Sequence, residues 1–148
     1  MLAETLIKII TRDLNNLKVE INAYKNENNL WIIKKGIKNT AGNLCLHLVG
    51  NLNHFIGNVL GNTGYIRERD LEFSIKGISK KELINQIEET IIMVEKVLKN
   101  LNEESFKEQY PIKVFKNNMT VQHFLIHLST HLAYHLGQVN YHRRLLDL

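Results

Sequence analysis

The chain has 148 residues, of which 44% are hydrophobic and 23% charged, an ordinary balance for one globular domain. Its net charge of +4 comes from scattered basic residues, without the block of like charges that is typical of a nucleic-acid-binding segment. No apolar run approaches the roughly 20 residues that span a bilayer, and the single cysteine, Cys45, excludes an internal disulfide and agrees with a reducing compartment. We therefore expect a cytoplasmic protein with one domain over residues 1–148, which binds neither nucleic acid nor membrane.

Four stretches carry apolar residues at the three-and-four spacing that predicts amphipathic helices. They cover about residues 2–24, 40–60, 79–98 and 120–146. Thr40 and Thr120 are suitable N-caps for the second and fourth helices, because a threonine oxygen accepts a free amide of the first turn. Ser79 and Glu82 have the spacing of a capping box at the start of the third.

The connections between these helices are long for a compact bundle. They comprise residues 25–39, 61–78 and 100–119, and long connections in small domains often lie over a functional site. Alternating residues in 110–115 hint at a short extended segment, but no convincing set of strands accompanies it. The sequence therefore predicts an all-α fold, a four-helix bundle with long loops between its helices.

Five of the seven histidines fall in the fourth helix: His123, His127, His131, His135 and His142. At about 100° per residue, His127 and His135 lie about 40° to either side of His131, beside the apolar face of the helix. The histidines around His131 thus border the surface that faces the core. For His123 and His142 we favour a place in solvent or at the polar rim.

The second helix repeats this layout. His47, Asn51, His54 and Asn58 fall within about 40° of one another and form a polar line beside an apolar arc. Cys45 points about 160° away from His47, which indicates a buried thiol and not a ligand. Two helices with the same offset between apolar arc and histidine line can pack together and direct both lines into one cleft.

This arrangement suits a divalent metal ion. His131 and His135 stand four residues apart on one helical face, and His47 supplies a third imidazole from the neighbouring helix. Neutral imidazole binds zinc and nickel well, and three protein ligands leave positions open for water or substrate. We expect zinc or nickel. The segment lacks the glutamate of a zincin motif, so proteolysis of that type is not indicated.

Residues 43–48 (NLCLHL) and 127–138 (HLSTHLAYHLGQ) resemble the DinB/YfiT-like superfamily of four-helix bundles with a three-histidine metal site. The second string is similar to that superfamily's H-x3-H-x3-H-x-G-Q signature. The resemblance implies that His47, His131 and His135 are the metal ligands. It also implies that His127 occupies a position that is often histidine without being a ligand.

Three further segments look like an uncharacterised branch of that superfamily, namely residues 50–52, 64–70 and 141–144. With the helix count, the resemblance covers essentially the whole chain and implies a DinB/YfiT-type bundle. Such bundles often pair, so we also expect a homodimer. Leu14 and Val19 lie off the main apolar line of the first helix and offer a surface for that contact.

Some members of the superfamily transfer low-molecular-weight thiols such as bacillithiol or mycothiol, and others are hydrolases or isomerases. The resemblance therefore implies a metal-dependent enzyme that acts on a small-molecule substrate, as a thiol S-transferase or a hydrolase, with a thiol as a possible co-substrate. The alternative is a non-catalytic, metal-dependent stress or binding module that forms a dimer. The residues themselves identify no catalytic base.

Six residues are candidates for contacting the metal ligands or the substrate: His54, His127, Gln138, Tyr65, Arg67 and Arg69. For His127 we favour a hydrogen-bonded group beside the ligands over a fourth ligand. For His54 the competing interpretation is that it lies on an exposed polar stripe. The two arginines suit an anionic group on a substrate, and they equally suit ion pairs with the acidic residues around them.

Overall fold

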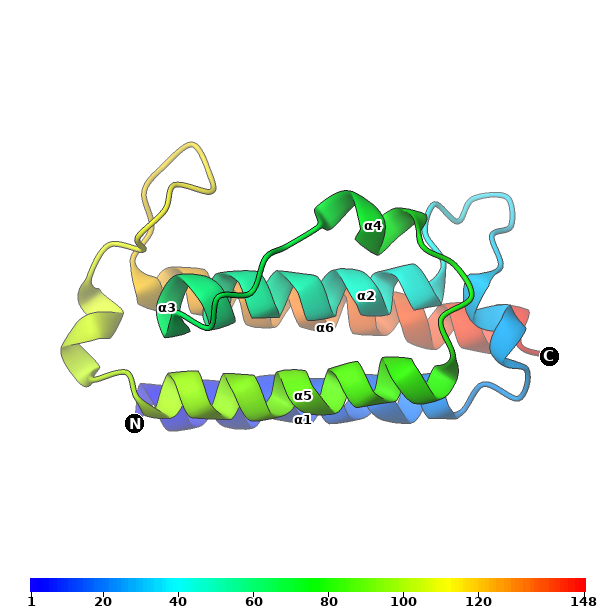
Figure 1. The fold of residues 1–148 in the computed structure, drawn as a ribbon, viewed down its shortest axis with the longest axis horizontal. Helices are drawn as coiled ribbons and strands as arrows, with labels where there is room; N and C mark the ends of the chain where they lie inside the picture. Colours follow the sequence, from blue (N-terminus) through cyan, green and yellow to red (C-terminus); the bar gives the residue numbers. More distant parts are fainter.

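The computed structural model describes residues 1–148 and is all-helical, which confirms the all-α part of the predicted fold. Four long helical segments lie side by side along the molecule (Figure 1). They are α1 (Leu2–Asn22), α2 (Ala41–Leu52) with its continuation through the π-helical η2 (Asn53–Asn58) and α3 (Val59–Gly61), α5 (Lys80–Lys99) and α6 (Val121–Leu146). Shorter elements are η1 (Glu27–Trp31), α4 (Arg69–Ser74) and η3 (Glu103–Lys107). None of the helices has the length and apolar character needed to cross a bilayer.

The order of the helices brings α4 over α2. α1 packs against α5 and α6, and α2 packs against α6 and α5. In Figure 1, α2 and α5 run in the same direction although they follow one another in the chain. The connection between them therefore travels back along the length of the molecule, and α4 lies against α2 on that path. This return places the polar residues of the 61–78 connection above the histidine face of α2.

The helix starts that the sequence predicts are confirmed. The side chains of Thr40, Ser79 and Thr120 each accept a hydrogen bond from the backbone amide three residues later. α1 ends at Asn22 and not at Tyr24, because the chain turns there into the connection to η1. The extended segment expected at 110–115 is absent: pairing is limited to one isolated bridge between Gln109 and Thr120.

The core is one cluster of 27 buried hydrophobic residues contributed by all four long segments. Cys45 lies within it, fully buried as expected, and burial raises the pKa of its thiol to about 12. Leu14 was expected on a surface for a dimer contact, but it is fully buried. The reason is that α5 and α6 together cover more of the surface of α1 than its main apolar line. Val19 alone of the two residues is exposed, so the surface suggested for a dimer contact is reduced.

His142 is a second correction, since it is buried and not at a polar rim. Its Nε2 lies 2.8 Å from the carbonyl oxygen of Ile32, and its Nδ1 lies 2.7 Å from the hydroxyl of Tyr24. A carbonyl can only accept, so Nε2 carries the proton and Nδ1 accepts the Tyr24 hydroxyl. Burial lowers the pKa of His142. The connection after α1 packs over the C-terminal end of α6 and covers the ring of His142. Helical spacing alone places this ring at the edge of the apolar face of α6.

Asp147 fastens the same connection to the end of α6. Its carboxylate accepts the backbone amides of Lys25 and Asn26 at 2.6 and 3.2 Å, and the side-chain amide of Asn29 at 2.9 Å. With His142 bound to Ile32, the connection between α1 and α2 is tied to α6 at several points. The entry into α2, and so the position of its histidine face, is thereby held.

We expect Tyr24→Phe to lower the free energy of unfolding by about 1–3 kcal/mol, because it leaves the buried Nδ1 of His142 without a donor. Urea unfolding measures the loss. The control is Tyr141→Phe, which removes a hydroxyl from an exposed ring beside His142 and should change stability by less than about 0.5 kcal/mol. Equal losses in the two variants would contradict this account of His142.

Candidate metal centre

Three histidines from two helices converge. His47 lies on α2 and His131 and His135 lie on α6, and each offers a nitrogen within 4.8 Å of those of the other two. The Nε2 atoms of His47 and His131 are 3.2 Å apart. The ring centroids of His131 and His135 are 4.5 Å apart, as a pair four residues apart on one helical face requires. The structure thus brings together the three residues that the sequence singled out.

Hydrogen bonds at the opposite ring nitrogens orient two of these side chains. Nδ1 of His47 lies 3.0 Å from Oε1 of Glu72, and Nδ1 of His135 lies 2.7 Å from Oε1 of Gln138. A carboxylate or amide oxygen accepts, so both rings donate through a proton on Nδ1, and it is Nε2 of each ring that is available as a ligand atom. A second hydrogen bond of this kind is the usual support of a metal-binding histidine.

The third ring, His131, has its Nδ1 buried without a partner, and its Nε2 faces His47. Burial, with smaller contributions from His135 and His47, lowers the pKa of His131 to about 4. The ring is therefore neutral at neutral pH and able to donate a lone pair.

The spacing of one pair of these nitrogens, those of His47 and His131, also fits a shared ion. Two nitrogens bound to one ion at about 2.0–2.1 Å lie about 2.8–3.4 Å apart for octahedral to tetrahedral angles. The 3.2 Å between the Nε2 atoms of His47 and His131 falls in that range. Three imidazole nitrogens close to one another are a suitable donor set for a first-row divalent ion.

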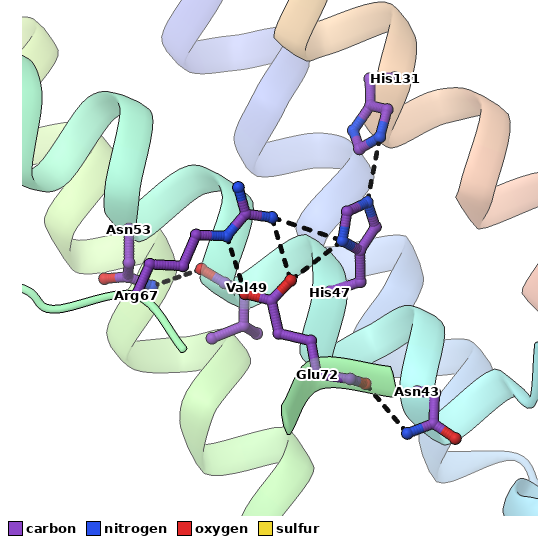
Figure 2. Close-up of polar contacts among 7 residues, drawn as sticks. All are labelled: Asn43, His47, Val49, Asn53, Arg67, Glu72 and His131. Atoms are coloured by element: carbon purple, nitrogen blue, oxygen red, sulfur yellow. Dashed lines mark hydrogen bonds and ion pairs between the residues drawn. The ribbon is translucent and has the colours of Figure 1, made fainter. Parts of the chain in front are cut away.

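Glu72 is the residue of this site that sequence reasoning did not assign to it. Its carboxylate accepts Nδ1 of His47 and both Nε and Nη2 of Arg67, at 2.9 and 3.0 Å, as Figure 2 shows. Burial alone would raise the pKa of Glu72, but the bonds from His47 and Arg67 and the arginine's charge outweigh it and lower the pKa. Asn43 donates to the carbonyl oxygens of Glu72 and Ile75, and these bonds attach α4 to α2.

A glycine on α2 makes room for this carboxylate. A Cβ placed on Gly50 would lie 1.9 Å from Oε2 of Glu72 and 2.6 Å from its carboxyl carbon, far inside contact distance. Any larger residue at this position must shift the carboxylate of Glu72, whose other oxygen accepts Nδ1 of His47. Gly50 is therefore part of the support of the site, although it carries no side chain.

The remaining candidates lie around the three histidines. His127 is outside the group of three; its ring centroid is 6.2 Å from that of His131 and 4.9 Å from that of Phe115. His54 is also outside it, with its ring 4.7 Å from that of Phe55. His54 falls in the π-helical turn, which has more residues per turn than the 100° spacing assumes, so the polar line expected along α2 does not continue unchanged. His123 is exposed, as expected.

Two cavities border the site. One of about 370 Å³ adjoins His47 and His131, and a second of about 520 Å³ adjoins His135 and Gln138. Arg67 and Arg69 line the smaller cavity, whereas Tyr65 does not. Arg67 pairs with Glu72, as the competing interpretation expected, and Arg69 stacks over Phe73 at 5.4 Å.

Fold and side chains together define an all-helical protein with a three-histidine group that could hold a metal ion. Residues 4–147 match the model of a family described as "Protein of unknown function (DUF1572)". The chain belongs to this family. No curated protein matches it.

We expect Gly50→Ala to lower metal affinity about 10- to 100-fold, because the new Cβ displaces Glu72 and leaves His47 without its supporting hydrogen bond. Competition with a chromophoric zinc chelator measures the affinity. Gly137→Ala is the matched control, since a Cβ there meets no atom within 4 Å although the residue lies between His135 and Gln138. If both variants keep the affinity of the unchanged protein, Glu72 does not support the site.

Proposed function

We propose that this chain is a DinB/YfiT-like four-helix bundle that binds zinc or nickel on His47, His131 and His135 and transfers a thiol to a small-molecule substrate. One observation carries the proposal: three imidazoles, two of them held through Nδ1, offer ring nitrogens within 4.8 Å of one another beside a cavity. The resemblance of residues 127–138 to the superfamily signature supports it, because two of the converging histidines belong to that string.

The chain's own residues have distinct tasks in this proposal. The three histidines contribute no charge, so a bound divalent ion keeps its full positive charge and lowers the pKa of a thiol that binds it. Glu72 orients His47, and Arg67 balances the charge of Glu72. The cavity beside His47 and His131 gives a substrate access to the same point.

Thiol transfer fits these residues better than hydrolysis. The carboxylate nearest the histidines is Glu72, and three hydrogen bonds and a lowered pKa make it a poor base. A thiol has only one proton to lose, and a divalent ion held by His47, His131 and His135 would supply the positive charge that favours its loss to solvent. Transfer of the sulfur would further require a substrate with an electrophilic carbon and a leaving group that departs with its bonding pair.

Cobalt substitution tests this proposal directly. We expect cysteine, added to the cobalt-loaded protein, to produce a sulfur-to-metal charge-transfer band in the near ultraviolet, because three protein ligands leave a position open. Serine, which has a hydroxyl in place of the thiol, should produce no such band. The His131→Ala variant should lose both cobalt and the band.

The opposite result is equally specific. A cobalt-loaded protein whose spectrum changes with neither cysteine nor any other small thiol has no accessible position for sulfur. That outcome would reject thiol transfer and favour the non-catalytic binding module.

A further inference from the structure

The smaller cavity has a cationic residue in its lining that forms no ion pair. Arg69, at the start of α4, lines this cavity and is exposed to solvent. Its guanidinium carbon lies 5.4 Å from the ring centroid of Phe73, and it pairs with no carboxylate, although Glu68 and Asp70 flank it in the chain. A guanidinium that stacks on a ring face keeps the N–H donors along its edge available, so Arg69 can bind an anionic group.

A second guanidinium in the lining keeps one nitrogen unused. Arg67 donates Nε and Nη2 to Glu72, and its guanidinium carbon lies 5.6 Å from the ring centroid of Phe55. Figure 2 shows its third nitrogen, Nη1, directed away from this carboxylate. Among side-chain nitrogens and oxygens, only Oδ1 of Asn51 and Nδ1 of His131 are buried without a partner, so Nη1 of Arg67, which makes no hydrogen bond, is accessible. Two arginines held over aromatic rings therefore line one cavity with N–H donors that no protein group occupies.

The balance of charge in this lining is positive. No aspartate or glutamate lines the cavity, and Glu72 offsets the charge of Arg67 alone, so the charge of Arg69 is left uncompensated. Val114 and Phe115 also line the cavity and are 40% and 42% exposed, which leaves apolar side-chain surface accessible in it. A ligand that matches both features is an anion with an apolar part.

We infer that this cavity binds a small-molecule substrate in which a carboxylate or phosphate group is attached to a short apolar chain. The anionic group accepts hydrogen bonds from Arg69 and from Nη1 of Arg67, and the chain packs against Val114 and Phe115. The cavity volume of about 370 Å³ lies at the small end of the range for ligand sites, which limits the substrate to a small molecule. The inference rests on the proposed function only in that the reactive carbon of the substrate faces His131, which lines the same cavity.

Four simple probes separate the two contacts. Butyrate has the anionic group and a propyl chain, butyramide has the same chain without the charge, and acetate has the charge with a single methyl group. Propylphosphonate carries a phosphate-like anion on the propyl chain of butyrate. Two-dimensional ¹H–¹⁵N NMR titration of the zinc-loaded protein reports both the affinities and the residues that respond.

We expect butyrate to shift the backbone amides of Arg69 and Phe115 in a saturable manner. It should bind about tenfold more tightly than butyramide, which is the gain from a charge-assisted hydrogen bond. It should also bind about tenfold more tightly than acetate, because two more methylene groups leave water. The tighter of butyrate and propylphosphonate identifies the anionic group as carboxylate or phosphate. Equal affinities for butyrate and butyramide, or shifts confined to residues outside the cavity, would overturn the inference.

A pair of arginine variants assigns the anionic contact. Arg69→Gln should remove the preference for butyrate over butyramide, because it removes the uncompensated charge. Arg144→Gln is the matched control and should keep the preference, since Arg144 is also exposed and stacks over Tyr141 at 5.1 Å but does not line this cavity. Both variants retain the three histidines, so any direct binding of the anion to zinc is common to them. The same preference in both variants would overturn the assignment.

A second pair assigns the apolar contact. Phe115→Ala should reduce the advantage of butyrate over acetate, because the propyl chain loses the ring on which it packs. Ile112→Ala is its matched control, since Ile112 lies in the same connection, is also 42% exposed, and does not line this cavity. An advantage that both variants keep in full would contradict the place assigned to the chain.

Failure of the proposed function gives a different pattern. A protein that takes up no zinc, or whose cobalt form does not respond to cysteine, rejects thiol transfer on a metal. Its preference for butyrate, and the dependence of that preference on Arg69, remain measurable and decide the inference by themselves. Conversely, a cobalt-loaded protein with a thiol band, in which butyrate binding does not depend on Arg69, retains the proposed function and loses the anionic substrate assigned to this cavity.

Discussion

The hydrogen bond between Glu72 and His47 depends on how the chain crosses α2 between its second and third long helical segments. That crossing returns along the molecule, and Asn43 holds α4 against α2 at one end of the contact. Gly50 leaves the space into which the carboxylate of Glu72 enters. The bond in turn fixes the proton of His47 on Nδ1 and directs Nε2 toward His131 (Figure 2).

The electrostatics of the site follow from the same contact. Arg67 neutralises Glu72 through two hydrogen bonds, so the pair adds little net charge beside the three imidazoles. Burial opposes protonation of His131 and His135, and the pKa of each is lowered. The three histidines are therefore held between two helices with a preference for their uncharged form at His131 and His135, and two cavities border them.

Much of this site follows from helical periodicity. The spacing of His131 and His135, and the equal offset of His47 from its apolar arc, are properties of regular helices and were readable in the sequence. Glu72 was not, because it lies on α4, and a helix of six residues is too short to show a helical period in the sequence. His142 and Leu14 were misplaced for a related reason: the segments that cover them are set by tertiary packing and not by the helix on which they lie.

Metal content of three matched proteins tests the central claim most directly. After zinc loading and removal of free ion, elemental analysis should find about one equivalent in the unchanged protein and in His123→Ala, whose ring is exposed and outside the group. His131→Ala should retain less than about a tenth of an equivalent, because it loses one of three ligands. No metal in the unchanged protein, or equal metal in His131→Ala and His123→Ala, would contradict the three-histidine centre.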